Sequence, residues 1–149
     1  MVICMSSKRV TVRKRQQLSQ ELHDWVIEKT VEKLYGEAKK EGSKICTNPN
    51  QKKRCDVKGL YPDIVVSNPK TKKVTTIDEI ETEVGETEKD QWEDFAKLGV
   101  PYFSVTIPLS EVKNAKKIIK DNKIAVTSLW SYETKYPKDK TIDFNEETL

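Results

Sequence analysis

Two β-rich segments joined by a short turn constrain the fold of this chain more than any other feature. Residues 60–67 and 73–83 are rich in β-branched and apolar side chains, and the turn sequence Asn-Pro-Lys-Thr-Lys at residues 68–72 separates them. Segments of this composition at hairpin distance pair as antiparallel strands. We therefore expect an antiparallel hairpin near the middle of the chain.

The regions around this hairpin predict helices that alternate with strands. Runs without proline that end at glycine, and runs with apolar residues at helical spacing, indicate helices. Expected helices span residues 16–41, 87–98 and 110–122; further strands are expected at 102–107 and 124–130, and a weak strand, turn and return at 43–59. Strand-helix-strand connections imply parallel neighbours, so the sequence predicts an α/β fold with an αβββαβ core, a mixed sheet and helices on both faces.

The 149 residues are enough for one ordinary domain. We expect a single α/β domain at residues 16–135, a flexible or β-edge basic arm at residues 1–15, and a frayed polar tail at residues 136–149. The apolar residues of the long first helix lie on two sides. This helix is therefore expected to be buried on different faces at its two ends, or bent near Gly36.

Composition limits the classes of protein to which this chain can belong. It has no apolar run long enough to span a bilayer, and its N-terminus lacks the pattern of a signal peptide, so we expect a cytoplasmic protein without membrane association. The 34% of charged residues fits a thermophilic source. The three cysteines do not have zinc-site spacing; Cys46 and Cys55 either form a disulfide or are ordinary thiols.

Acidic residues gather at one end of the predicted hairpin. Asp63 opens the first strand, and the second strand ends in Asp-Glu-Ile-Glu-Thr at residues 78–82. Side chains two apart in a strand point to the same face, so Glu79 and Glu81 share a face with Ile77. If Asp63 projects to that face, three carboxylates converge and raise one another's pKa. A bound Mg²⁺ or Mn²⁺ would relieve this repulsion.

A carboxylate-bound divalent cation of this kind suits the hydrolysis of a phosphodiester. The cation can activate a water for in-line attack and neutralise the charge that develops on the phosphate and the leaving oxygen. Phosphodiester hydrolysis is therefore the reaction that the acidic pattern favours.

The order of these segments resembles the PD-(D/E)xK nuclease superfamily. The resemblance lies in Tyr-Pro-Asp-Ile-Val-Val at residues 61–66, Ile-Asp-Glu-Ile-Glu-Thr at 77–82 and Lys-Asp-Gln-Trp-Glu-Asp-Phe at 89–95. In layout the chain is most similar to archaeal Holliday-junction resolvases and restriction-endonuclease-like proteins, over about residues 16–107. The resemblance implies a restriction endonuclease-like core and a DNA nuclease that uses Mg²⁺ or Mn²⁺.

The same resemblance implies roles for individual residues. Asp63 and Glu79 would be metal ligands, with the backbone carbonyl of Ile80 as a third, and Gln91 would lie near the site. A glutamate of the first helix would complete the cluster; the choices are Glu21, Glu28 and Glu32, which share one helical stripe. We favour Glu28 because it is central and has large neighbours, whereas His23 is expected on the helix surface.

One residue departs from the pattern of the superfamily. Glu81 stands where the lysine that orients the water is usual. Some restriction endonucleases of the superfamily carry glutamate there and remain active, and a lysine from elsewhere, such as Lys89, is another solution. The alternatives are a non-catalytic DNA-binding or assembly module on the same fold, and a protein-interaction domain in which the acidic hairpin is solvated surface.

DNA binding is expected to use two basic segments. The set is Arg13, Lys14, Arg15, Lys52, Lys53 and Arg54. These side chains would contact phosphates on either side of the acidic site. They contain no base-reading pattern, so we expect branched or duplex DNA to be bound without sequence specificity. Cleavage of two strands by one small site usually needs two copies, and a homodimer is therefore expected.

Overall fold

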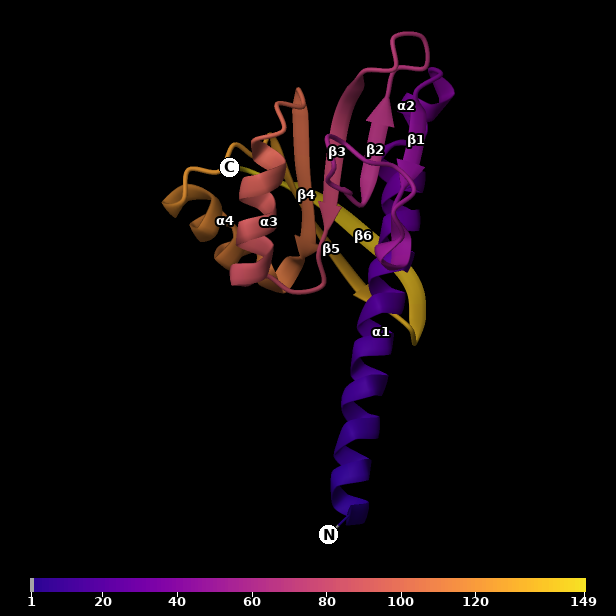
Figure 1. Cartoon of the computed structure of the whole chain (residues 1–149), viewed down its shortest axis with the longest axis vertical. Coiled ribbons are helices and arrows are strands. Elements are labelled where there is room, and N and C mark those ends of the chain that lie inside the picture. Colours follow the sequence, from indigo (N-terminus) through magenta and orange to yellow (C-terminus); the bar gives the residue numbers. More distant parts are fainter. Residues whose placement is uncertain (1) are drawn as a thin grey trace.

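A computed structural model of the chain shows a six-stranded mixed sheet with helices on both faces (Figure 1). The structure describes the backbone of residues 2–149 and the side chains of residues 17–149. The strands follow one another across the sheet in chain order, and they are β1 Lys44–Thr47, β2 Ile64–Ser67, β3 Val74–Ile80, β4 Tyr102–Pro108, β5 Ser128–Lys135 and β6 Asp139–Glu147. The expected α/β class is confirmed.

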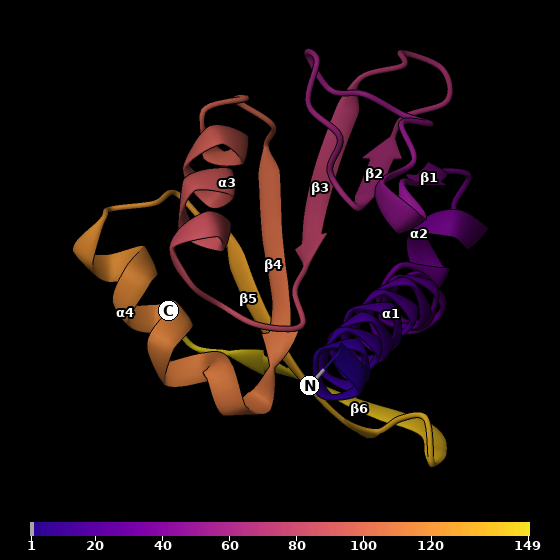
Figure 2. The ribbon, with the colours of Figure 1, turned by 60° about the horizontal axis from the view of Figure 1, so that its bottom comes forward.

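The helices lie on opposite sides of this sheet. They are α1 Val2–Leu34, α2 Gly36–Lys40, α3 Glu86–Ala96 and α4 Val112–Asp121, with short 3-10 turns at Pro49–Gln51 and Leu109–Glu111. Figure 2 shows α3 and α4 together on one side and α1 on the other. The break between α1 and α2 at Tyr35 agrees with the bend expected near Gly36.

The pairing of the strands follows the predicted pattern. The pairs β1–β2 and β2–β3 are antiparallel, so the central hairpin is confirmed. The pairs β3–β4 and β4–β5 are parallel because α3 and α4 form the crossovers between them. The sheet is therefore mixed, with β3 between an antiparallel and a parallel neighbour.

Alternation along β3 divides the apolar residues between two cores. Ile77 packs with Trp92 and Phe103 under α3 and α4. Ile80 packs with Val26 and other apolar residues under α1. Because successive side chains of a strand point to opposite faces, Glu79 and Glu81 follow Ile77 toward α3. The predicted assignment of these faces is confirmed.

The C-terminal segment corrects one prediction. Residues 136–149 were expected to fray, but β6 pairs antiparallel with β5 along most of its length. The buried side chain of Ile142 and the half-buried Phe144, two residues further on, hold this strand against the core under α1. Two apolar residues at strand spacing are enough to anchor a segment that is otherwise polar. The last parallel strand also begins at Ser128, later than expected.

The N-terminal segment corrects a second prediction. Residues 1–15 were expected to form a flexible or β-edge arm, but the backbone from Val2 onward is part of α1, which extends beyond the sheet (Figure 1). The side chains of Arg13, Lys14 and Arg15 lie outside the described residues.

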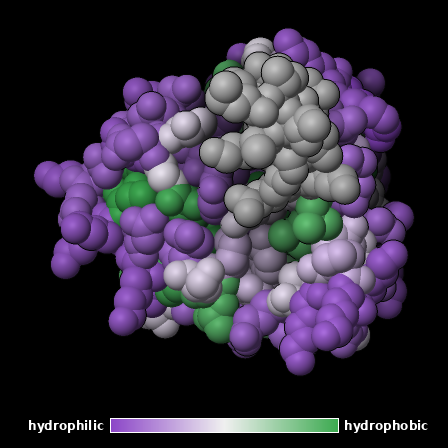
Figure 3. All heavy atoms as spheres, turned by 90° about the horizontal axis from the view of Figure 1, so that it is seen from below, coloured by the Kyte–Doolittle hydropathy of each residue, from purple (hydrophilic) through white to green (hydrophobic). Residues whose placement is uncertain are grey.

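Charged and polar side chains cover most of the face shown in Figure 3, where the visible apolar side chains form separate areas. Among the helices that the structure describes, none has the length and hydropathy needed to cross a membrane.

Candidate active site

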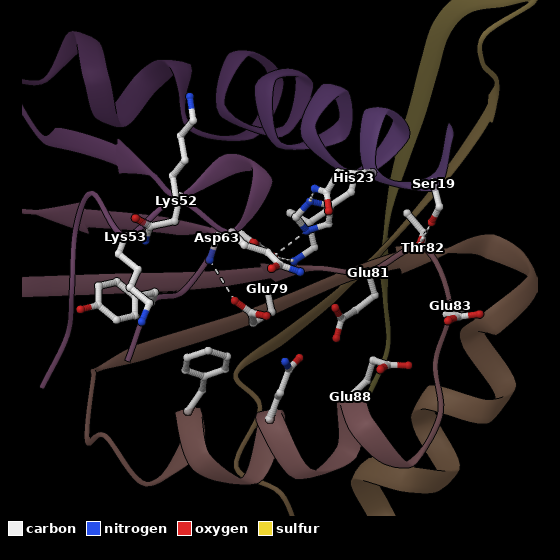
Figure 4. A pocket seen from close by; sticks show the side chains of 17 residues that line it. Ser19, His23, Lys52, Lys53, Asp63, Glu79, Glu81, Thr82, Glu83 and Glu88 are labelled. Atoms are coloured by element: carbon white, nitrogen blue, oxygen red, sulfur yellow. Dashed lines mark hydrogen bonds and ion pairs between the residues drawn. The ribbon is translucent and has the colours of Figure 1, made fainter. Parts of the chain in front are cut away.

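The end of the central hairpin brings Asp63 and Glu79 into contact. Ile64 is opposite Asp78 in the β2–β3 register, so Asp63, one residue earlier, is opposite Glu79. The amide of Asp63 donates to Glu79 Oε1 at 2.9 Å, and the amide of Ile80 donates to Asp63 Oδ2 at 2.8 Å (Figure 4). Each carboxylate is thus fixed by the backbone of the opposite segment, and the predicted convergence of these two residues is confirmed.

Glu81 is a third buried carboxylate beside this pair. Trp92 Nε1 donates to Glu81 Oε2 at 2.8 Å, which fixes the side chain against α3. The Tyr132 hydroxyl donates to the Glu81 carbonyl at 2.7 Å, and the Glu81 amide donates to the Thr106 carbonyl at 2.9 Å. The side chain and the backbone of Glu81 are therefore both held by hydrogen bonds.

Burial and mutual repulsion raise the proton affinity of this cluster. Burial raises the pKa of Glu79 well above its usual value, and the charges of Asp63 and Glu81 raise it further. Burial and the charge of Asp63 raise the pKa of Glu81 to about 8. Acids that repel one another in this way gain stability when a cation binds among them.

Helix α1 contributes a histidine to the cluster. His23 Nε2 is 3.1 Å from Asp63 Oδ2, and His23 Nδ1 is 3.2 Å from Asp24 Oδ1. Burial of the ring opposes its charge, but the hydrogen bonds and charges of Asp63 and Asp24 raise the pKa of His23 to about 9. The expectation that His23 is a surface residue is therefore wrong, and at neutral pH its imidazolium is paired with Asp63.

The glutamates of the first helix do not reach the cluster. Glu28 is exposed and is not part of the cleft wall. Glu21 is exposed beside Gln17, and Glu32 is exposed beside Lys29. The prediction that Glu28 completes the site is therefore wrong.

The rotation of α1 about its axis explains this difference. Val26 and Ile27 are buried against the sheet, and His23 precedes them by three and four residues, so it lies on the same face of the helix. The apolar pair was the signal in the sequence from which the position of His23 could have been found.

These residues lie in a cleft of about 650 Å³ between α1, α3 and the segment that connects β1 to β2. Gln91, together with Glu88 and Phe95, enters its wall from α3, so the prediction that Gln91 lies near the site is confirmed. Figure 4 shows the cleft from close by, with Asp63, Glu79 and Glu81 in its central part.

Two lysines of the connecting segment line one end of this cleft. Lys52 and Lys53 are in the wall, whereas Arg54 is exposed and is not. Lys89 is not in the wall either, because its ammonium lies 3.1 Å from Glu93 Oε1 on the surface of α3. Lys52 and Lys53 therefore line the cleft, and Lys89 does not.

Asn48 holds the lysine-bearing segment in place. Its side-chain nitrogen donates to the carbonyls of Cys55 and Pro62, and its side-chain oxygen accepts from the amides of Arg54 and Cys55. A disulfide between Cys46 and Cys55 closes the same loop. Sequence reasoning missed the role of Asn48, although an asparagine before proline is a common signal for an ordered turn.

The donor atoms of the site fit a hard divalent cation. Within residues 17–149, no group of three or more His, Cys, Asp and Glu side chains is arranged as a metal cluster. Asp63 Oδ1 and Glu79 Oε2, however, accept no hydrogen bond from described residues. The carbonyl of Ile80 points to the same edge of β3 as the amide of Ile80, which donates to Asp63. Mg²⁺ typically binds one or two carboxylates and keeps several waters, which suits this donor set.

Comparisons of this chain with protein-family models, with curated proteins and with solved structures found no match. The chemistry of the cleft therefore provides the basis for a functional inference.

Proposed function

We propose that this chain is a metal-dependent nuclease that hydrolyses phosphodiester bonds in DNA, with a site of the PD-(D/E)xK type. The observation that carries this proposal is that the Asp63 amide donates to the Glu79 carboxylate and the Ile80 amide donates to the Asp63 carboxylate, beside a third buried acid. The three acids occupy a cleft whose wall also contains two lysines and an exposed glutamine. Clustered acids beside phosphate-binding cations are the groups that phosphodiester hydrolysis requires.

The residues of the cleft have distinct roles in this proposal. Asp63, Glu79 and the Ile80 carbonyl hold Mg²⁺ or Mn²⁺, which when bound supplies Lewis acidity and lowers the pKa of a water. His23 is a positioning residue that fixes one oxygen of Asp63 and leaves the other for the ligand. The Gln91 amide can orient a water or a phosphate oxygen, and Lys53 can offset phosphate charge.

A cleavage assay with matched variants tests this function. The wild-type chain is incubated with branched, duplex and single-stranded DNA and with Mg²⁺ or Mn²⁺, and products are resolved on a denaturing gel. Asp63→Asn and Glu79→Gln should each reduce cleavage at least about 100-fold. Glu28→Gln is the matched control, since this exposed glutamate lies on α1 outside the cleft, and its activity should equal that of wild type.

Calorimetry with Mn²⁺ provides a second readout that does not depend on the choice of DNA. The wild-type chain should bind the ion and both site variants should not. A folded wild-type chain that neither binds Mn²⁺ nor cleaves any substrate would contradict the proposed function.

A second candidate function is a non-catalytic DNA-binding module on the same fold. The observation in its favour is the hydrogen bond from Trp92 that builds a glutamate into the position of the usual lysine. This function predicts salt-sensitive DNA binding that is equal in wild type and Asp63→Asn, without any affinity for Mn²⁺.

A further inference from the structure

An exposed aromatic ring stands at the lysine end of the cleft. Tyr61 is 37% exposed, lines the cleft and precedes Asp63 by two residues. The Lys53 ammonium lies over one face of the Tyr61 ring, 5.4 Å from its centroid, and the opposite face is the one to which a planar group could stack. A base stacked on that opposite face would place its phosphate near this lysine and close to the acid cluster.

The three acids are almost completely buried in the wall of the cleft. The exposed fractions of Asp63, Glu79 and Glu81 are 9%, 5% and 8%. The cleft of about 650 Å³ has the size of a small-molecule pocket and is walled by α1 on one side and α3 on the other. A duplex keeps its bases stacked inside a wide, stiff rod, whereas a single strand can bend into such a space and turn a base outward.

We propose that this cleft takes a single-stranded segment of nucleic acid, with one base stacked on Tyr61 and the adjoining phosphate held by Lys52 and Lys53. This inference rests on the proposed nuclease function and names its substrate class. Stacking on an aromatic ring beside basic side chains is the usual way in which proteins bind single strands without reading their sequence.

The charges along the cleft also indicate where the single-stranded nucleic acid would lie. Figure 4 shows Lys52 and Lys53 at one end and Glu83 and Glu88 at the other, with the buried acids between them. Phosphates are attracted to the lysine end and repelled from the glutamate end. The bound nucleic acid therefore lies over Tyr61, and its phosphate approaches Asp63 from the lysine end of the cleft.

The backbone around Tyr61 is held in position before any ligand binds. The carbonyl of the next residue, Pro62, accepts a hydrogen bond of 2.6 Å from the buried side chain of Asn48. The disulfide between Cys46 and Cys55 closes the loop that carries both lysines. An ordered platform loses little conformational freedom on binding, which favours affinity for a flexible strand.

Binding measured in EDTA tests this inference separately from catalysis. Fluorescence anisotropy compares the full chain with a labelled single-stranded oligodeoxynucleotide, an oligoribonucleotide of the same sequence and the corresponding DNA duplex, all at one salt concentration. Binding to one or both single strands should be at least about tenfold tighter than binding to the duplex. The two single-stranded arms show which sugar the cleft prefers.

Variants of Tyr61 test the stacking contact. Tyr61→Ala should weaken single-strand binding about 5- to 150-fold, the loss expected for one base-aromatic stack. Tyr61→Phe should bind like wild type, and Tyr61→Leu, which keeps bulk without an aromatic face, should bind like the alanine variant. Tyr102→Ala is the matched control because Tyr102 is also 37% exposed but lies outside the cleft. Melting curves establish that each variant is folded.

Variants of the lysines test the phosphate contact. Lys53→Gln should weaken binding and reduce its dependence on salt, as expected when a protein loses a phosphate contact. Lys70→Gln should change neither quantity, because this exposed lysine lies in the turn at the opposite end of the hairpin.

The outcomes separate this inference from the proposed function. Duplex binding as tight as single-strand binding, or wild-type binding by Tyr61→Ala, would overturn the single-strand inference even where metal-dependent cleavage is observed. Single-strand binding that depends on Tyr61, in a chain that neither binds Mn²⁺ nor cleaves, would support a single-strand site and remove the nuclease function.

Discussion

At the scale of single residues, the acid cluster has a neighbour on the opposite face of the sheet. Asp78 is completely buried and accepts hydrogen bonds from the Tyr35 hydroxyl at 2.6 Å and from Thr106 Oγ1 at 3.0 Å. Burial raises the pKa of Asp78 to about 7, although both hydrogen bonds oppose this rise. Asp78 therefore links the stability of the fold to pH without lining the cleft.

We predict that Asp78→Asn removes part of this pH dependence. A carboxyl with a raised folded-state pKa stabilises the fold fully below its unfolded pKa of about 4, and this contribution is lost as pH rises toward 7. Relative to the asparagine variant, wild type should lose up to about 4 kcal/mol of unfolding free energy over that range. Urea unfolding in EDTA at several pH values measures the difference, and parallel curves for both proteins would contradict this role of Asp78.

At the scale of elements, β6 connects the end of the chain to α1. The side chain of Ile142 is buried in the core that contains Val26, and the Lys33 ammonium of α1 donates to the Ile142 carbonyl at 2.9 Å. This strand therefore supports the helix that carries His23. A change at Ile142 should affect the whole fold, although it lies in a segment of mostly polar composition.

The prediction for β6 compares two adjacent residues. Ile142→Ala should reduce the free energy of unfolding by about 2 to 5 kcal/mol, because it leaves a cavity under α1. Asp143→Ala changes the exposed neighbour and should stay within about 0.5 kcal/mol of wild type. Chemical unfolding followed by circular dichroism measures both, and equal stabilities would indicate that β6 is frayed.

The disulfide is a second element whose contribution can be measured. It joins cysteines nine residues apart, and closing a loop of this length should stabilise the fold by about 3 kcal/mol through the loss of freedom in the unfolded chain. A reducing agent should lower the stability of wild type by that amount. The double variant Cys46→Ser with Cys55→Ser should have a lower free energy of unfolding than wild type, and the reductant should not change it. If the reductant also destabilises this variant, the loss of stability does not come from the disulfide.

At the scale of the whole molecule, the candidate site depends on both faces of the sheet. Helix α1 on one face supplies His23, and helix α3 on the other supplies Gln91. Asp63 and Glu79 come from the hairpin between these helices. These elements meet where β2 begins and β3 ends. A ligand bound at this point would therefore hold the two layers of the fold together.

This arrangement predicts that Mn²⁺ stabilises the intact molecule. An ion at about 100 times its dissociation constant should raise the free energy of unfolding by about 2.7 kcal/mol, because it binds only the folded chain. Glu79→Gln should remove this effect, whereas Glu28→Gln should retain it. Thermal melts with and without Mn²⁺ provide the measurement, and an equal shift in the Glu79 variant would show that the ion binds elsewhere.

Relations between residues that are close along the chain could be predicted from the sequence. Alternation in the hairpin assigned Glu79 to the face of Ile77, and the turn at residues 68–72 predicted the antiparallel pairing; that Asp63 lies opposite Glu79 depends on a register shift after Val66, which the sequence did not specify. The face and the pairing were predictable because strand periodicity and a short turn depend on neighbouring residues alone. The α/β class and the antiparallel hairpin followed from them.

Relations between distant segments depend on packing in three dimensions and could not be predicted in this way. His23 reaches Asp63 across 40 residues, and Tyr132 reaches Glu81 across 51. Which side of α1 faces the sheet, and therefore why His23 and not Glu28 enters the cleft, depends on packing against strands that come later in the chain. The pairing of β6 and the position of Tyr61 beside the acids have the same origin, since helical or strand periodicity within one segment does not specify its partner.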